Sequence, residues 1–260
     1  MRTMRVTLRE AFARMLPNRR REIRRGAIER IAFEDRLITV YLPHGYDGGR
    51  AYPVLYMKDG QNLFDDERSF ARHSWRLHEA ADEAIGARTA EPMIIAGIDH
   101  AGDARIDEYT SDEYAHTLLK RIKPLIEAKY RTNGAAIGGS SLGGLVSLRL
   151  GLKYPDVFTA LAAMSPSVWW NDRVVLKEVD AFEGPRPRIW LDIGGREGQK
   201  ALNDARLLRE HLVAKGWTDA DLRYYEDRRG DHSERAWGKR ARMMLEFLFP
   251  PRPLDVSNGS

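Results

Sequence analysis

The 260-residue chain is 43% hydrophobic and 31% charged, a balance typical of one large soluble domain with a substantial core. It has no cysteine, which excludes disulfides, thiolate catalysis and cysteine metal sites, and no apolar run approaches the ~18 residues of a membrane-spanning helix. Ten arginines against three glutamates give residues 1–30 a net charge of +7, whereas the whole chain carries +4, so residues 31–260 have a net charge of −3. The positive charge is thus confined to the N-terminal segment, and this distribution predicts no nucleic-acid partner.

The first predicted element is a basic N-terminal arm over residues 1–25. Residues 7–16 show an amphipathic helical pattern, with apolar side chains on one face and arginines on the other. Such a helix suits weak contact with an anionic surface, and packing on the protein's own domain is the alternative. The arm lacks the apolar core of about 7–15 residues that a secretory signal needs, so we expect a cytoplasmic protein.

The remaining elements follow in chain order. Apolar patterns and turn residues predict strands at 26–33, 36–42, 53–57, 93–98, 134–138, 158–164, 188–193 and 222–226. Helices are predicted at 71–85, 112–130, 142–154, 201–215 and 234–249. Strands that alternate with helices indicate an α/β fold with a mostly parallel central sheet flanked by helices. We expect a single domain at 26–250 without a large lid, followed by a disordered tail at 251–260.

The most informative motif joins the strand at 134–138 to the helix that follows it. Gly139-Ser140-Ser141-Leu142-Gly143 reads G-x-S-x-G, the nucleophile elbow of α/β-hydrolases. The glycines are needed because a Cβ two residues on either side of the strained serine would collide with the adjoining strand and helix. Ser141 alone has glycine at both positions, so it is the predicted nucleophile. A glycine-rich turn without chemistry is the alternative.

A serine hydroxyl becomes a good nucleophile only when a base takes its proton. In α/β-hydrolases the serine is followed along the chain by the acid and then by the histidine. His211 and His232 are the candidates that leave room for a strand in between. His211 falls within a predicted helix, whereas His232 lies in the loop after the last predicted strand. His232 is therefore the predicted base.

The acid of the triad is expected on the loop after the penultimate strand. Glu197 lies beyond two glycines, at the carboxyl edge of the sheet where ligands bind in such folds. Asp192 still belongs to the predicted strand, and Asp204 is a more distant candidate. Glu197 is the predicted acid, with Asp192 left open, and its role is to hold the imidazole tautomer and stabilise the imidazolium.

Two backbone N–H groups should form the oxyanion hole. One belongs to Leu142, the residue after the nucleophile, and the other to the loop after the third strand, Asp59-Gly-Gln-Asn62. We assign Gln61 as this second donor, with Asn62 as the alternative.

The substrate pocket is expected to be bordered by the same loops. Asp59, Asn62 and Ser140 are its predicted polar residues. Trp169 and Trp170 follow the end of a strand and offer large flat surfaces for an acyl or sugar group, and packing beneath the loops is the alternative.

Other charged residues give no sign of a metal site. The acidic run at residues 65–67 lacks ligand spacing, and His73 and His78, five residues apart, do not share a helix face. Arg105, in the segment Arg-Ile-Asp-Glu-Tyr that ends at Tyr109, is either part of a structural ion pair or a substrate clamp. No metal and no other cofactor is expected.

Five segments of the chain, in the same order, resemble one esterase family of the α/β-hydrolases. That family includes S-formylglutathione hydrolases, enterochelin-type siderophore esterases, acetyl-xylan and feruloyl esterases, and mycolyltransferases. The segments are Tyr56-Met-Lys-Asp-Gly-Gln-Asn-Leu-Phe64, Gly138-Gly-Ser-Ser-Leu-Gly-Gly144, Met164-Ser-Pro-Ser-Val-Trp-Trp170, Leu191-Asp-Ile-Gly-Gly-Arg-Glu197 and Asp231-His-Ser-Glu-Arg-Ala-Trp237. The resemblance implies a metal-free serine hydrolase of carboxylic esters. Family members often have histidine where Lys58 stands and aspartate where Glu197 stands.

The sequence thus predicts a cytoplasmic serine esterase that acts through an acyl-enzyme on small-molecule esters with small acyl, carbohydrate or phenolic groups. Two alternatives stay open: an acyltransferase of the same fold, and a binding protein that kept the fold without turnover. The sequence makes no prediction of the oligomeric state.

Overall fold

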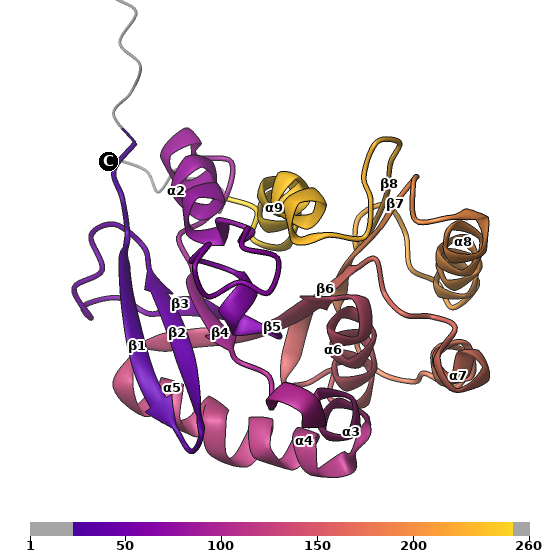
Figure 1. The fold of residues 1–260 in the computed structure, drawn as a ribbon, viewed down its shortest axis with the longest axis horizontal. Coiled ribbons are helices and arrows are strands. Elements are labelled where there is room, and N and C mark those ends of the chain that lie inside the picture. Colours follow the sequence, from indigo (N-terminus) through magenta and orange to yellow (C-terminus); the bar gives the residue numbers. More distant parts are fainter. Residues whose placement is uncertain (1–22, 252–260) are drawn as a thin grey trace, which may run out of the picture.

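The computed structural model describes residues 23–251 (Figure 1). The predicted arm and tail lie almost wholly outside this part of the chain. The strands are β1 (Ala27–Phe33), β2 (Arg36–Leu42), β3 (Tyr52–Met57), β4 (Ile94–Ile98), β5 (Thr132–Ser140), β6 (Phe158–Met164), β7 (Arg188–Gly194) and β8 (Leu222–Asp227). The α-helices are α2 (Leu77–Ala87), α3 (Arg105–Thr110), α4 (Asp112–Thr117), α5 (Lys123–Lys129), α6 (Ser141–Lys153), α7 (Trp170–Asp180), α8 (Gln199–Ala214) and α9 (Glu234–Leu248). Shorter helical turns span Gly60–Asn62, Gly102–Ala104 and Leu118–Ile122.

All eight strands form one sheet in the order β1-β2-β4-β3-β5-β6-β7-β8. The β1–β2 and β2–β4 pairs are antiparallel, and every pair from β4 to β8 is parallel. This confirms the predicted α/β-hydrolase fold with a mostly parallel sheet. The register pairs Ser140 with Met164 and Met164 with Asp192. Because parallel strands end at a common edge of the sheet, the segments that follow these three strands meet there.

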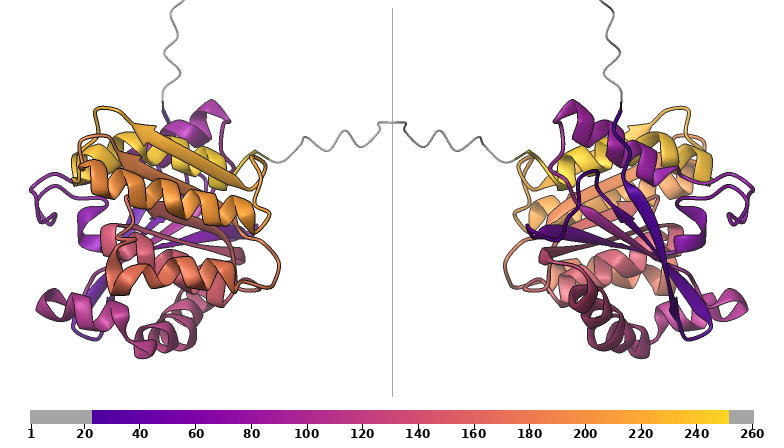
Figure 2. Two further views of the ribbon diagram at one scale, coloured as in Figure 1. Left: turned by 90° about the vertical axis from the view of Figure 1, so that its right-hand side faces the viewer. Right: turned by 90° about the vertical axis from the view of Figure 1, so that its left-hand side faces the viewer.

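Helices cover both faces of the twisted sheet (Figures 1 and 2). On one face, α2 and α9 pack over a core that includes Leu77, Trp237 and Met244. On the other, helices α3 to α8 pack over a larger core that includes Leu145 and Leu208. The central strands are buried on both sides, which explains why β4 reads Ile-Ile-Ala-Gly-Ile without any alternation of polar residues.

Two predicted helices differ from the structure. The helix expected at 71–85 begins only at Leu77, because the preceding residues form a loop whose N–H groups bond to the segment at 62–66, as Trp75 N does to Asn62 O at 2.9 Å. The helix expected at 112–130 is divided into α4, a π-helical turn and α5. Helices α3 and α7 were not predicted.

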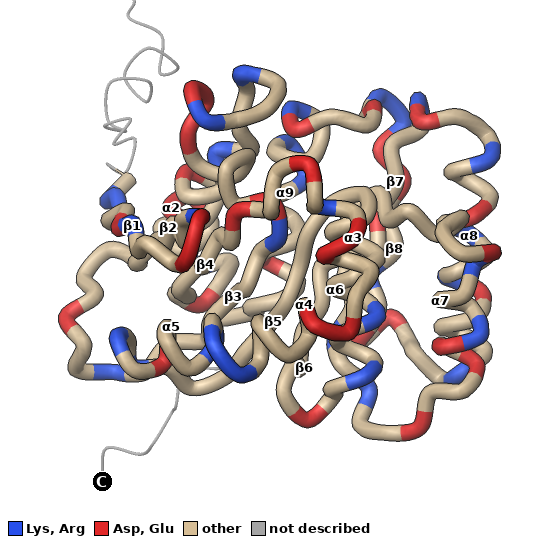
Figure 3. Tube along the Cα trace, turned by 60° about the horizontal axis from the view of Figure 1, so that its bottom comes forward, with Lys and Arg blue, Asp and Glu red and all other residues tan. Residues whose placement is uncertain are grey.

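Charges of both signs are interspersed over the described residues, without a face of a single sign in the view of Figure 3. Within residues 23–251, no helix is both long enough and apolar enough to cross a membrane.

Candidate active site

The elbow between β5 and α6 has the strained geometry that its sequence predicts. Ser141 has a φ of 55°, in the left-handed region that non-glycine residues rarely adopt. A Cβ on Gly139 would lie 2.8 Å from the carbonyl carbon of Gly143. A Cβ on Gly143 would lie 3.0 Å from a carboxylate oxygen of Asp59. The backbone therefore approaches itself here as closely as glycine allows, and the serine side chain is presented above the edge of the sheet.

Three side chains, one from the start of α6 and two from loops, meet at this edge in one hydrogen-bonded chain. His232, between β8 and α9, places Nε2 3.0 Å from Ser141 Oγ. Its Nδ1 lies 2.7 Å from Oε2 of Glu197, which comes from the loop after β7. The Glu197 side chain is 3% exposed and the His232 side chain 47%. A buried carboxylate thus orients a ring that solvent and a substrate can reach.

The second carboxylate oxygen of Glu197 is also engaged. Oε1 accepts hydrogen bonds from the Ser165 hydroxyl at 2.5 Å and from the Gly194 N–H at 2.8 Å. Burial raises the pKa of Glu197, but the hydrogen bonds from His232, Ser165 and Gly194 outweigh it, so the pKa lies below its ordinary value. Glu197 is therefore an anion at neutral pH.

The alternative acids and the alternative base are all engaged with other charged side chains. These pairs are Asp192 with Arg240, Asp204 with Arg173, and His211 with Asp180. Asp192 is fully buried and accepts the Ser165 N–H rather than a bond from His232.

The loop after β3 is fixed by a second set of charges. Asp59 has a φ of 56° and receives two hydrogen bonds from the Arg105 guanidinium, at 2.6 and 2.7 Å. The Tyr109 hydroxyl contacts the same carboxylate at 3.2 Å. Arg105 forms the structural ion pair that was one of its two predicted roles, and it also borders the cavity beside Ser141.

Gln61 and Asn62 have different surroundings on this loop. The Asn62 side chain accepts from the Phe70 N–H at 3.0 Å and donates to Glu234 at 3.3 Å, so it ties the following loop to the start of α9. The Gln61 side chain accepts from the His100 N–H at 3.4 Å.

A cavity of about 460 Å³ opens beside Ser141. It is lined by Asp59, Asn62, Phe70, His100, Gly102, Asp103, Arg105, Ser140, Ser141, His232, Glu234 and Trp237. Trp169 and Trp170 do not border it, which corrects the expectation that they wall the pocket. Trp169 is 54% exposed, and Trp170 packs against the larger core.

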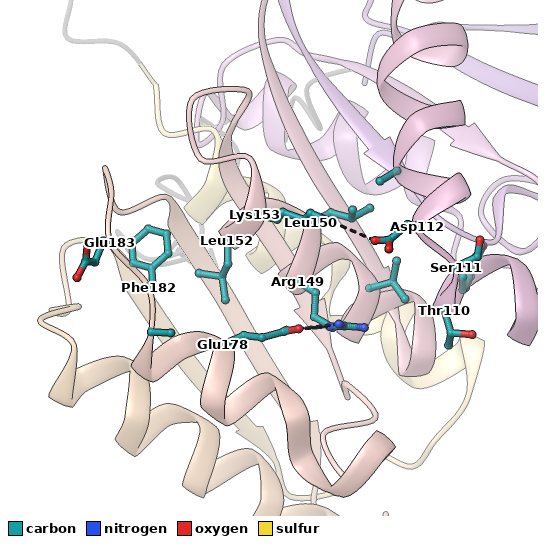
Figure 4. Close-up of a pocket in the computed structure, with 14 residues that line it drawn as sticks. Thr110, Ser111, Asp112, Arg149, Leu150, Leu152, Lys153, Glu178, Phe182 and Glu183 are labelled. Atoms are coloured by element: carbon teal, nitrogen blue, oxygen red, sulfur yellow. Dashed lines mark hydrogen bonds and ion pairs between the residues drawn. The ribbon is translucent and has the colours of Figure 1, made fainter.

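A second cavity, of about 430 Å³, lies between α3, α4, α6 and α7 (Figure 4). Its polar groups include two ion pairs, Arg149 with Glu178 and Lys153 with Asp112. Its lining contains none of the three residues of the hydrogen-bonded chain, and the cavity beside Ser141 is therefore the candidate active site.

Comparison with known proteins agrees with this geometry. The sequence model of the family described as "Putative esterase" matches residues 32–248. The chain belongs to this family. It is therefore a carboxylic ester hydrolase.

Two curated relatives are similar to this chain over most of its length. The esterase is 24% identical over 255 residues to uncharacterized protein YbbA from Bacillus subtilis, covering 86% of this chain and 97% of the relative. It is 28% identical over 222 residues to the siderophore triacetylfusarinine C esterase of Aspergillus fumigatus, covering 73% of each. A solved structure, the enterobactin esterase from Shigella flexneri, superposes with a TM-score of 0.70 at 18% identity, over 86% of this chain and 59% of that one. This last similarity shows the fold alone.

Four side chains around the site of the esterase were not singled out from the sequence: Ser165, Ser167, Trp237 and Arg240. Ser167 Oγ lies 3.4 Å from Ser141 Oγ, and the Trp237 ring meets the His232 ring edge-on at 4.9 Å. Three of the four, Ser165, Ser167 and Trp237, fall within the segments that carry the family resemblance, and that resemblance is the signal that could have found them. Arg240 lies outside those segments.

The described residues contain no cluster of three or more histidine, cysteine or acidic side chains suited to a metal ion. In the acidic run at 65–67, Asp66 instead accepts hydrogen bonds from Ser74 and Arg76.

Proposed function

We propose that the protein is a serine esterase in which Ser141, His232 and Glu197 form the catalytic triad. The observation that carries the proposal is the continuous hydrogen-bonded chain, 3.0 Å from Ser141 to His232 and 2.7 Å from His232 to Glu197. Each role follows from this order, since the middle residue touches both the nucleophile and a buried anion.

In the first half of the reaction, Ser141 Oγ attacks the ester carbonyl while its proton passes to His232 Nε2. Glu197 stabilises the imidazolium that results. The tetrahedral intermediate then expels the alcohol, which takes the proton from His232, and an acyl-enzyme remains. In the second half, water attacks the acyl carbonyl with His232 as base, and collapse of that intermediate returns the proton to Ser141 and releases the carboxylic acid.

The oxyanion hole in this proposal consists of the N–H groups of Leu142 and Gln61. Leu142 stands in the first turn of α6, where N–H groups have no partner within the helix and the helix dipole favours negative charge. On the loop after β3, the N–H of Asn62 already donates to the Asp59 carbonyl at 2.9 Å. That bond favours Gln61 over the Asn62 alternative.

The cavity favours an ester with an aromatic or otherwise flat group beside the scissile bond. Phe70 is 91% exposed on its rim and Trp237 contributes to its lining, while Arg105 and His100 supply polar contacts. Relatives are named for the hydrolysis of siderophore esters. We therefore propose phenolic or siderophore-type esters as the substrate class.

The test combines a mass-tagged fluorophosphonate with Ser141→Ala. The probe should label Ser141 in the wild type, and the variant should fold normally, escape labelling and lose ester hydrolysis. Ser147→Ala is the matched control, because it removes a fully buried hydroxyl from the same helix. An adduct on Ser140, or substantial turnover by Ser141→Ala, would contradict the proposed nucleophile.

A substrate panel then separates the remaining alternatives. It compares acetyl and feruloyl esters with a ferric siderophore ester, each with and without an added alcohol. Faster turnover of the feruloyl or siderophore ester supports the proposed class. A transesterified product that outweighs the free acid would identify an acyltransferase instead, and the absence of any enzyme-dependent release of p-nitrophenol from a p-nitrophenyl ester would identify a binding protein.

A further inference from the structure

Ser165 occupies an unusual position behind the proposed triad. It follows β6 directly, is 2% exposed and has a φ of 43°, in the left-handed region. Its N–H is held by Asp192, with contacts of 3.1 Å to a carboxylate oxygen and 3.0 Å to the carbonyl. Strain of this kind in a buried serine persists only where the surroundings fix it, and it is typical of functional sites.

The Ser165 hydroxyl has three polar partners. Trp237 Nε1–H and Arg240 Nη2–H both donate to its oxygen at 3.0 Å. The remaining contact is with Glu197 Oε1, at 2.5 Å. A hydroxyl has two acceptor positions and one hydrogen to donate. Since indole and guanidinium groups only donate, both acceptor positions are taken and the hydrogen is directed to Glu197.

The two groups that set this direction are themselves held in place. The Arg240 side chain is 1% exposed and pairs at 3.0 Å with Asp192, which is fully buried. Arg240 also lies 3.6 Å from Asp227, and Asp192 accepts a further bond from the Trp190 indole at 2.7 Å. A buried ion pair with added hydrogen bonds fixes geometry more than it adds stability. The donor direction of Ser165 is therefore built into the core.

We infer that Ser165 is a positioning residue that keeps Glu197 ionised and so holds the imidazole proton of His232 on Nδ1. Oε1 of Glu197 receives hydrogens from Ser165 and the Gly194 N–H, which leaves Oε2 to accept from His232. The ring nitrogen Nε2 then keeps its lone pair for Ser141. The inference rests on the proposed triad and adds to it the group that sets its proton arrangement.

The test replaces Ser165 by glycine, which removes the hydroxyl and accepts a positive φ without strain. We expect kcat to fall about 10- to 100-fold with little change in KM, the range for loss of one charge-assisted hydrogen bond. The acid limb of the pH profile of kcat should move to higher pH, because the loss of a hydrogen-bond donor raises the pKa of Glu197. The neighbouring charged groups Arg240, Asp192 and Asp227 stay in place. Ser147→Ala serves again as the matched control, since its buried hydroxyl has no hydrogen-bond partner among the described residues.

A spectroscopic measurement addresses the tautomer directly. In ¹⁵N-histidine-labelled wild type, His232 should carry its proton on Nδ1 near neutral pH, and the population of that tautomer should fall in Ser165→Gly. Should Ser165→Gly not fold, Trp237→Phe removes one of the two N–H donors and keeps a ring beside His232. Trp237→Phe should show smaller decreases in kcat and in the population of the Nδ1–H tautomer of His232.

The inference is overturned if the folded variants keep the wild-type kcat, acid limb and His232 tautomer. It is also overturned if wild-type His232 carries its proton on Nε2. The proposed function fails by a different result, namely turnover by Ser141→Ala. The tautomer measurement does not depend on turnover, so the two failures are distinguishable.

Discussion

Lys58 lies against the elbow, where a Cβ added to Gly139 or Gly143 would be 3.0 Å from the Cβ of Lys58. It offers a test of how a buried charge at this position affects the free energy of unfolding. Its side chain is fully buried, and Nζ, 5.0 Å from the centre of the Tyr114 ring, has no hydrogen-bond partner among the described residues. Burial lowers the pKa of Lys58 from 10.5 to about 7, against the opposing effect of Asp59 and Glu108. The native state thus releases this proton above pH 7, whereas the unfolded chain keeps it up to about pH 10.5.

The replacement Lys58→Met should therefore stabilise the protein, because it keeps an unbranched apolar stem and removes the buried charge. The gap between 10.5 and about 7, at about 1.36 kcal/mol per pH unit, gives a gain of at most about 5 kcal/mol at pH 7 and below. Between these pH values the unfolded state of the wild type binds more protons, so the stability of the wild type rises with pH. The advantage of the variant should shrink accordingly and largely vanish near pH 10.5.

Urea unfolding of both proteins, followed by circular dichroism from pH 6 to 9.5, measures this difference. Lys177→Met, at an exposed lysine of α7, is the matched control and should show no such dependence on pH. A difference that stays constant with pH, or a Lys58→Met protein less stable than the wild type at pH 6, would refute the reasoning.

Two further predictions concern the base and the arm. His232→Ala should lower kcat by about 10⁴- to 10⁶-fold, whereas His211→Ala, which removes only a hydrogen bond with Asp180, should stay near the wild-type rate in the same assay. The reverse pattern would overturn the assignment of the base. A chain that starts at Arg24 should keep turnover on small esters, because the proposed catalytic residues lie between positions 61 and 232, and any binding to anionic vesicles should disappear with the arm and weaken as salt rises. Loss of folding or of small-ester turnover in that chain would show that the segment belongs to the core.

The sequence by itself determined the fold class and the elements that carry the candidate site. Gly139 and Gly143 make Ser141 the predicted nucleophile, because only glycine tolerates the close approach of strand and helix at the elbow. The chain order of parallel strands then places Glu197 and His232 at the same edge of the sheet. The three side chains do meet at that edge, because their placement depends on local backbone geometry and on a general rule about strand ends.

Other features were decided only by the tertiary structure. The loop at 71–76 is not helical, because the N–H groups of Ser74 and Trp75 bond to the segment at 62–66 instead of to carbonyls one helical turn earlier. Trp169 and Trp170 do not line the cavity, although their position after a strand suggested that they would. Side-chain direction at such positions depends on how separate elements pack, which no local pattern encodes.

The hydrogen-bond network around Ser165 shows the same limit most clearly. It joins Ser165, Asp192, Glu197, Trp237 and Arg240, which come from three separate parts of the chain: the end of β6, β7 with the loop after it, and α9. Each residue alone reads as an ordinary polar or aromatic side chain. Only folding brings them within hydrogen-bonding distance in the interior, where the two N–H groups that donate to Ser165 set the direction of its own proton.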